Sequence, residues 1–222
     1  RTGTSQWSSP EWPCWQWIVE DWQASPFPRA TETETESGQN HQQSRAAFKL
    51  LQIDEKYKFL APGLSVVDLG CAPGGWLQIA SQKVSSIVGK EKVVGVDLLP
   101  TEDIPGSISI IGDISDRIIG EKLIQIIGTK PNIIMSDMAA NTTGHRQTDN
   151  IRTTYLLETA LDFAIENLKK NGVFLAKCFK GGAEIEALSL MRKHFSKVNH
   201  IKPDASRKES VEGYVIAVGF KG

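Results

Sequence analysis

Short apolar runs rich in Val and Ile recur along the chain from residue 44 to the C-terminus. Most of them are separated by segments whose apolar residues have helical spacing, such as residues 154–168. Apolar strands that alternate with amphipathic helices predict a mostly parallel sheet covered by helices on both faces. Seven strands are predicted, at residues 65–69, 93–98, 108–111, 132–135, 173–176, 198–201 and 214–218.

The last two predicted strands are separated by a loop that contains Pro203, and not by a helix. A loop of this kind allows consecutive strands to pair antiparallel, whereas parallel neighbours need a longer crossover. We therefore expect an α/β fold with a seven-stranded, mostly parallel sheet and an antiparallel hairpin at one edge.

Residues 1–43 follow a different pattern. They contain five of the six tryptophans and four of the ten prolines, and they end in a T-E-T-E-T-E tract and a run of Gln, Asn and His. Prolines interrupt helices and central strands, and polar tracts are typical of solvated linkers. We expect a poorly ordered acidic arm at 1–43 and a folded domain at 44–222. The alternative for the tryptophans is a patch that binds a partner.

The whole chain has a formal charge of −1, from 25 basic and 26 acidic residues. The arm holds two basic and six acidic residues, which leaves the domain with a charge of +3. The near-neutral total therefore does not exclude a nucleic-acid partner. Hydrophobic residues make up 40% of the chain, but no apolar run approaches about 20 residues and no signal-peptide pattern occurs, so we expect a cytoplasmic protein without a membrane segment.

The three cysteines are widely separated, and the four histidines have no metal-ligand spacing with them. This pattern argues against a disulfide framework and against a zinc site, and no metal ion is expected. Cys71 and Cys178 lie in apolar surroundings and are predicted to be small core residues.

A glycine-rich turn, DLGCAPGGW at residues 68–76, follows the first predicted strand. Its glycines allow the backbone to approach a ligand at the crevice where doubly wound sheets bind cofactors. The turn differs from a dinucleotide fingerprint because Ala72 replaces the second glycine, and from a P-loop because Trp76 replaces the lysine. Such a turn alone is a weak signal, since it also serves to pack a strand against a helix.

Four successive predicted strands each end in an aspartate: Asp68, Asp97, Asp113 and Asp137. Each of these residues can also be a helix N-cap. At one rim of the sheet, beside the glycine-rich turn, they together indicate a ligand site. Asp97 suits the two hydroxyls of a ribose, and Asp113 suits an adenine amino group. A nucleoside pocket without phosphate-binding features points to S-adenosylmethionine.

Charged residues at the strand ends indicate chemistry as well. Asp137 follows the fourth predicted strand and Lys177 ends the fifth. A lysine at the end of an apolar run is costly to bury unless it is paired; the alternative is a surface lysine whose ammonium group reaches water. Lys49 and Glu212 are further candidates, but sequence spacing alone does not bring them together.

Five motifs occur along the chain: SRAAFKL at 44–50, DLGCAPGGW at 68–76, DLLP at 97–100, SDMAAN at 136–141 and SRKESVEGY at 206–214. In this combination, from residue 44 to residue 222, the chain closely resembles the FtsJ/RrmJ family of ribosomal RNA 2'-O-ribose methyltransferases. It departs from the family in the arm, because relatives usually carry a basic, helix-forming segment there.

The resemblance implies a Rossmann-like methyltransferase fold, S-adenosylmethionine as cofactor, and a uridine in the peptidyl-transferase A loop of large-subunit rRNA as substrate. It also implies that the partner is the large ribosomal subunit or its late precursor, and we expect the protein to be a monomer. The family's catalytic Lys-Asp-Lys-Glu set falls on Lys49, Asp137, Lys177 and Glu212, and its cofactor contacts fall on Gly74, Trp76, Asp97, Asp113 and Asp137.

Methyl transfer from a sulfonium to a ribose hydroxyl is an in-line displacement, which requires aligned reactants and removal of a proton from a weakly acidic alcohol. We assign Lys177 as the residue that activates or orients this hydroxyl. The sequence leaves open whether it is a general base or a positioning cation. Asp137 and Glu212 are expected to hold the lysines in place.

Basic residues in segments beside the predicted rim are candidates for binding RNA phosphates; the alternative is solvated surface charge. Residues 141–150 are predicted to be a mobile loop that closes over a bound nucleotide. The candidate phosphate contacts are Arg45, Arg146, Arg152, Lys180, Lys202, Arg207 and Lys208.

The sequence is also compatible with other functions. A 2'-O-methyltransferase acting on tRNA or on an mRNA cap uses the same four charged residues. A non-catalytic RNA-binding ribosome-assembly factor is a second alternative, against which the intact charged set argues. A small-molecule methyltransferase fits less well, because it leaves the basic residues around the rim without a role.

Overall fold

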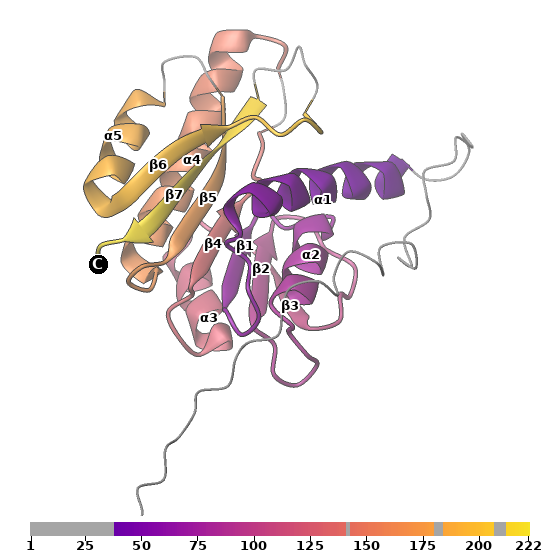
Figure 1. The fold of residues 1–222 in the computed structure, drawn as a ribbon. Helices are drawn as coiled ribbons and strands as arrows, with labels where there is room; N and C mark the ends of the chain where they lie inside the picture. The colour runs from indigo at the N-terminus through magenta and orange to yellow at the C-terminus, as the bar shows by residue number, and fades with distance from the viewer. Residues whose placement is uncertain (1–37, 141–142, 180–183, 207–211) are drawn as a thin grey trace, which may run out of the picture. The chain divides into compact units, whose positions relative to one another are not determined.

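The computed structural model describes residues 38–140, 143–179, 184–206 and 212–222 (Figure 1). Within this part of the chain the seven predicted strands are present, and they form one sheet. Strands β1 to β4 span Val66–Leu69, Val93–Asp97, Ser107–Ile111 and Ile133–Ser136, and strands β5 to β7 span Val173–Phe179, Phe195–Ile201 and Glu212–Phe220.

The strands lie in the order β3-β2-β1-β4-β5-β7-β6. Strands β1 to β5 pair in parallel, whereas β7 pairs antiparallel with both β5 and β6. The prediction of a mostly parallel sheet with an antiparallel hairpin at one edge is therefore confirmed. Strand β7 is buried along most of its length and lies inside the sheet, while β6, which has several exposed residues, forms the edge.

Helices cover both faces of the sheet, as the apolar strands predicted (Figure 1). Helices α1 (Gly38–Tyr57) and α2 (Gly75–Lys83) pack on one face, with strand residues such as Val66. Helices α3 (Arg117–Ile127), α4 (Arg146–Asn167) and α5 (Ile185–His194) pack on the other, with residues such as Val67. Successive side chains of a strand point to opposite faces, so each central strand contributes residues to the core on both sides of the sheet.

Two expectations about local order differ in outcome. Cys71 and Cys178 are buried in the core, as predicted. The interpretation of the Gln, Asn and His run as a linker was wrong, because α1 begins at Gly38. This stretch has no proline before Pro62, and the helix is anchored on the sheet by the fully buried Leu50 and Ile53. The other residues of the predicted arm, 1–37, lie outside the described residues.

The sheet topology marks one edge as the place for a ligand. Strands β1, β2, β4 and β5 run in parallel and end at the same edge. Strand order reverses between β1 and β4, because β2 and β3 lie on one side of β1 and β4 lies on the other. Doubly wound sheets bind ligands at such a switch point. Among the helices that the structure describes, none has the length and apolarity to cross a membrane.

Candidate active site

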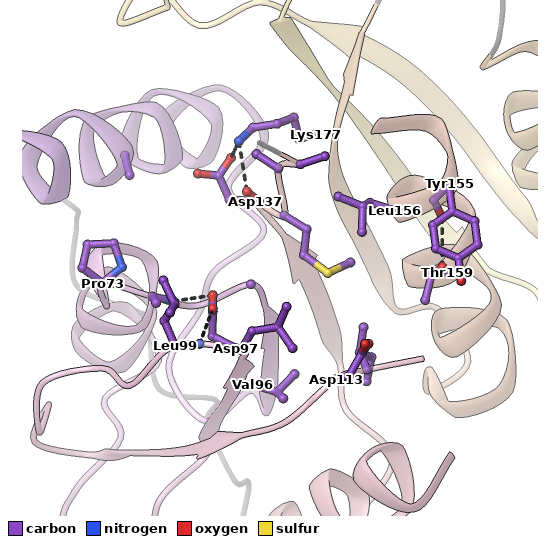
Figure 2. A pocket seen from close by; sticks show the side chains of 18 of the residues that line it. Pro73, Val96, Asp97, Leu99, Asp113, Asp137, Tyr155, Leu156, Thr159 and Lys177 are labelled. Carbon is purple, nitrogen blue, oxygen red and sulfur yellow. Dashed lines mark hydrogen bonds and ion pairs between the residues drawn. The ribbon is translucent and has the colours of Figure 1, made fainter. Parts of the chain in front are cut away.

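A cavity of about 910 Å³ lies at the carboxyl ends of the parallel strands (Figure 2). Its volume is in the range of pockets that hold small-molecule ligands. The loops after β1, β2, β3 and β4 line it, together with parts of α1, α4, β5 and β7. Six of the predicted site residues are among its walls: Lys49, Asp97, Asp113, Asp137, Lys177 and Glu212.

Lys177 and Asp137 form a largely buried ion pair in this cavity. Lys177 Nζ lies 2.8 Å from Asp137 Oδ1, and the lysine side chain is only 7% exposed. The same nitrogen donates to the backbone oxygen of Asp137 at 3.0 Å, as the dashed lines in Figure 2 show. The contact follows from strand register, because Ser136 at the end of β4 is paired with Ala176 on β5. The lysine is therefore held at two points.

Lys49 and Glu212 form the second ion pair, and it joins α1 to the start of β7. The two side chains are 16% and 21% exposed. Lys49 Nζ also lies 5.9 Å from the centre of the Tyr214 ring, within the range of a cation–π contact. The structure thus brings together the four charged residues whose convergence sequence spacing did not show.

Tyr214 is a site residue that the sequence reasoning did not single out. Its hydroxyl donates to Asp137 Oδ1 at 2.7 Å, and the side chain is fully buried. Burial, followed by the charges of Asp137 and Glu212, holds the pKa of Tyr214 well above its usual value, so the phenol stays a donor. One signal was available: residues two apart on a strand share a face, which places Tyr214 beside Glu212.

Asp97 and Asp113, two of the predicted cofactor contacts, lie at the end of β2 and on the loop after β3, and both line the cavity. Asp97 Oδ2 accepts from the backbone N–H of Ala72 and Oδ1 from that of Leu99, each at 2.9 Å, as Figure 2 shows in part. These bonds aim a carboxylate at the cavity and leave further lone pairs for a ligand. Asp113 Oδ1 accepts from the N–H and the hydroxyl of Ser115, which lowers the pKa of this carboxyl group.

Gly70 sits where the loops after β1 and β4 touch. Its φ of +79° is in the left-handed region, and a Cβ atom there would lie 2.5 Å from Met138 Cγ and 2.9 Å from Met138 Cα. Only glycine allows this approach. The glycine-rich turn thus forms a floor for the cavity between Asp97 and Asp137.

Gly74 and Trp76, the other two predicted cofactor contacts, do not line the cavity. Gly74 packs against Ile104, and the Trp76 side chain is 3% exposed in the core beneath α1. The indole Nε1–H donates to the carbonyl of Ala46 at 2.8 Å. Their contact with a cofactor stays a prediction.

Asp68 does not lie at the rim, so the expectation that it joins the other three aspartates was wrong. Strand β1 continues to Leu69, and Asp68 is 0% exposed between the neighbouring strands. Neither carboxyl oxygen has a hydrogen-bond partner among the residues that the structure describes. Burial, assisted by the charges of Asp137 and Asp97, raises the pKa of Asp68.

Only some of the predicted RNA contacts lie within the described residues. Arg152 on α4 and Lys202 after β6 are exposed. Residues Lys180, Arg207 and Lys208, and the side chains of Arg45 and Arg146, lie outside what the structure describes. The predicted mobile loop at 141–150 is helical from Arg146 onward, so that part of the prediction was wrong. The turn before the helix is fixed by Asp149, which accepts from the N–H and hydroxyl of Thr143.

The doubly wound sheet, the glycine-rich turn and the cavity at the carboxyl ends of the strands are typical of a Rossmann-like methyltransferase. The chain belongs to the FtsJ-like methyltransferase family, whose profile matches residues 42–220.

Similar proteins cover the same part of the chain. A ribosomal RNA large subunit methyltransferase E from Bartonella tribocorum is 53% identical over 179 residues, which are 81% of this chain and 74% of that protein. The protein of the same name from Mesorhizobium japonicum is 50% identical over 179 residues, 81% of this chain and 68% of that protein. A crystal structure assigned as a ribosomal RNA methyltransferase from Plasmodium falciparum superimposes with a TM-score of 0.71 at 26% identity, covering 81% of this chain and 99% of the other.

Proposed function

We propose that this protein transfers a methyl group from S-adenosylmethionine to the ribose 2'-hydroxyl of a uridine in the A loop of large-subunit ribosomal RNA. Its substrate is the large ribosomal subunit or a late precursor. The names of the relatives from Bartonella and Mesorhizobium support the large-subunit substrate. The observation that carries the proposal is the convergence of Lys49, Asp137, Lys177 and Glu212 on one cavity.

The residues present fit S-adenosylmethionine. The pre-oriented carboxylate of Asp97 suits a ribose diol, and Asp113 lies on the neighbouring loop for the base. The floor formed by Gly70 has no side chain to obstruct a ligand. When bound, this cofactor supplies an electrophilic methyl group on a sulfonium centre.

The chain's own residues then have to orient a ribose hydroxyl and stabilise its oxygen while it loses its proton. Lys177 Nζ is fixed by two acceptors of Asp137, and because an ammonium group has three donors, one more remains for a ligand in the cavity. We assign it to the hydroxyl, as a hydrogen-bonding partner that stabilises the oxygen. The hydroxyl proton passes to solvent water as the oxygen forms its bond to the methyl group. Asp137 orients Lys177, and the Lys49–Glu212 pair closes the RNA side of the cavity.

The test compares Lys177→Ala with Lys197→Ala, a matched removal of an exposed lysine on β6. Large subunits lacking the modification are incubated with labelled S-adenosylmethionine, and the methylated nucleotide is mapped. We expect Lys177→Ala to slow transfer by at least about 100-fold while cofactor binding persists, and Lys197→Ala to match the wild-type rate. A near wild-type rate for Lys177→Ala, with cofactor binding intact, would refute the assigned role.

The same assay separates the proposed substrate from its alternatives. Undermodified subunits, tRNA and capped RNA are presented in parallel, and the sugar position is read from the protected dinucleotide. Acceptance by tRNA or capped RNA but not by subunits would overturn the proposed substrate, and base methylation would overturn the proposed 2'-O chemistry.

A further inference from the structure

A buried aromatic pair lies beneath the charged residues of the cavity. Trp76 and Tyr214 are 3% and 0% exposed, and their ring centres are 5.7 Å apart with an interplanar angle of 36°. Neither side chain lines the cavity, but Tyr214 donates to Asp137, which does. A role for the Trp76 side chain therefore does not require direct contact with a ligand in the cavity.

Trp76 connects three parts of the molecule. It is the second residue of α2 and the last residue of the glycine-rich turn. Its N–H donates to the carbonyl of Ala46, which lies on α1 three residues before Lys49. Residues three apart on a helix share a face, so this bond sets the rotation and depth of the helix turn that carries Lys49.

The ring of Trp76 supports the Lys177–Asp137 ion pair by a different route. It packs against the Tyr214 ring, and the Tyr214 hydroxyl bonds to Asp137, the partner of Lys177. Tyr214 is also paired with Lys177 across strands β7 and β5, so the two side chains share a face of the sheet. A shift of the Tyr214 ring therefore moves the acceptor that holds Lys177.

We propose that Trp76 is a positioning residue for methyl transfer: its buried indole fixes α1 and the Tyr214 ring, and through them both lysine–carboxylate pairs, relative to the glycine-rich turn. The inference rests on the proposed function for the reaction that it supports. In this role, Trp76 aligns the lysine–carboxylate pairs, which act on the substrate, with the glycine-rich turn, which lies against the cofactor. In-line transfer is sensitive to this alignment, since displacements of about 1 Å can cost about 100-fold in rate.

The test is Trp76→Phe in the full chain, which keeps an aromatic ring and removes the N–H donor. Three quantities are measured: the dissociation constant of S-adenosylmethionine, the single-turnover rate on saturating undermodified subunits, and the hydrogen exchange of α1. We expect an unchanged dissociation constant, a rate lowered by about 10- to 100-fold, and faster exchange in α1. A weaker cofactor affinity with an unchanged saturated rate would show instead that Trp76 serves the cofactor and would overturn the inference.

Phe195→Leu is the matched control. Phe195 is 1% exposed and packs with Phe174 and Phe220 in the opposite core layer. Its substitution removes buried aromatic area at a distance from the charged pairs, so it is expected to lower thermal stability but not the single-turnover rate. Equal rate losses in both variants would reduce the role of Trp76 to general stability and overturn the inference.

A second variant covers the case in which Trp76→Phe does not fold. Benzothienylalanine at position 76 keeps the size and shape of the indole and lacks the N–H, so the bond to Ala46 is lost without a cavity. The same slow saturated rate and faster α1 exchange are expected; wild-type values for both would contradict the positioning role. Because exchange is measured without RNA, failure of the wild-type protein to methylate subunits refutes only the proposed function.

Coupling between the two rings is measured with a double-mutant cycle. Tyr214→Phe removes the bond to Asp137 and keeps the ring that Trp76 contacts. If both residues act on the Lys177–Asp137 pair, the rate losses of Trp76→Phe and Tyr214→Phe are not additive in the double variant. Strict additivity would show that Trp76 does not act through Tyr214.

Discussion

The carboxyl group of Asp68 is buried and has no hydrogen-bond partner among the described residues. Its pKa is raised in the folded protein by burial first, and then by Asp137 and Asp97. In the unfolded chain it titrates near the usual value of about 3.9. Above that pH the folded state binds more protons at this residue than the unfolded state, so stability falls as pH rises through the folded pKa.

The prediction for Asp68→Asn follows from this sign. The amide has no charge to bury, so the variant should gain stability relative to the wild type as pH rises from about 4 towards 8. Thermal unfolding of the cofactor-free protein across this range measures the difference. Parallel curves of Tm against pH for the two proteins would contradict the raised pKa.

Asp113→Asn is the control of opposite sign. The bonds from Ser115 lower the pKa of Asp113, so its ionised form stabilises the folded state above the unfolded pKa, and this contribution is lost as pH falls through the folded pKa. The variant should therefore differ from the wild type at neutral pH and converge with it in acid. Its curve should not resemble that of Asp68→Asn.

At the scale of elements, the contact between the loops after β1 and β4 decides the shape of the cavity floor. Gly70→Ala combines a strained φ with a clash of its Cβ against the Met138 backbone. We expect a loss of stability of about 1–3 kcal/mol and weaker binding of S-adenosylmethionine, because relief of the clash spreads the two loops. Calorimetry measures both quantities.

Gly89→Ala separates backbone strain from the clash. Gly89 has a φ of +81°, and a Cβ atom there meets no heavy atom within 4 Å. This variant should lose stability through strain alone and bind the cofactor as the wild type does. Equal cofactor affinities in all three proteins would show that the approach of Gly70 to Met138 does not shape the cofactor site.

Elements also show what local patterns predict well. All seven strands were predicted because each contains a short apolar run, which is a local property. The Gln, Asn and His run before residue 44 was interpreted as a linker, but α1 begins at Gly38, because such a stretch is polar enough for a linker and also compatible with a helix. Packing of Leu50 and Ile53 on the sheet favours the helix, and this packing is tertiary.

At the scale of the whole molecule, charge is divided unevenly along the chain. The total of −1 combines an acidic segment over residues 1–43 with a charge of +3 over residues 44–222. A charge of +3 is modest for RNA binding, so affinity for subunits should depend on where basic residues lie. Arg152 is exposed on α4 one turn before Tyr155, which lines the cavity.

Arg152→Ala tests this distribution. If Arg152 binds a phosphate, the slope of log affinity for undermodified subunits against log salt should become shallower by about 1. Arg192→Ala is the control, because Arg192 lies far from the cavity. It is in the last turn of α5, just before β6 begins at Phe195. Phe195 pairs with Phe220, at the opposite end of β7 from the cavity residue Glu212. Identical salt slopes for the two variants would exclude a phosphate contact of Arg152.

The candidate site was only partly predictable. Asp97, Asp113, Asp137 and Lys177 follow or end apolar strands, and parallel strands bring their ends to one edge, so these residues were within reach of a local argument. The same argument is wrong for Asp68 because β1 continues for one more residue, to Leu69. Asp68 therefore lies within the strand, and its side chain points into the core. That Lys49 and Glu212 belong to the same site was expected only from the family resemblance, and their direct pairing was not predicted.

The order of apolar runs, the glycine-rich turn and the five motifs are written in the chain, because they depend on neighbours within about ten residues or on direct comparison of letters. The meeting of Lys49 with Glu212, 163 positions apart, and of Trp76 with Ala46 and Tyr214, is not. These contacts depend on how deeply α1 docks and on the register of β7 against β5. Register and docking are set by the packing of the whole core, so the folded structure alone decides which charges face each other.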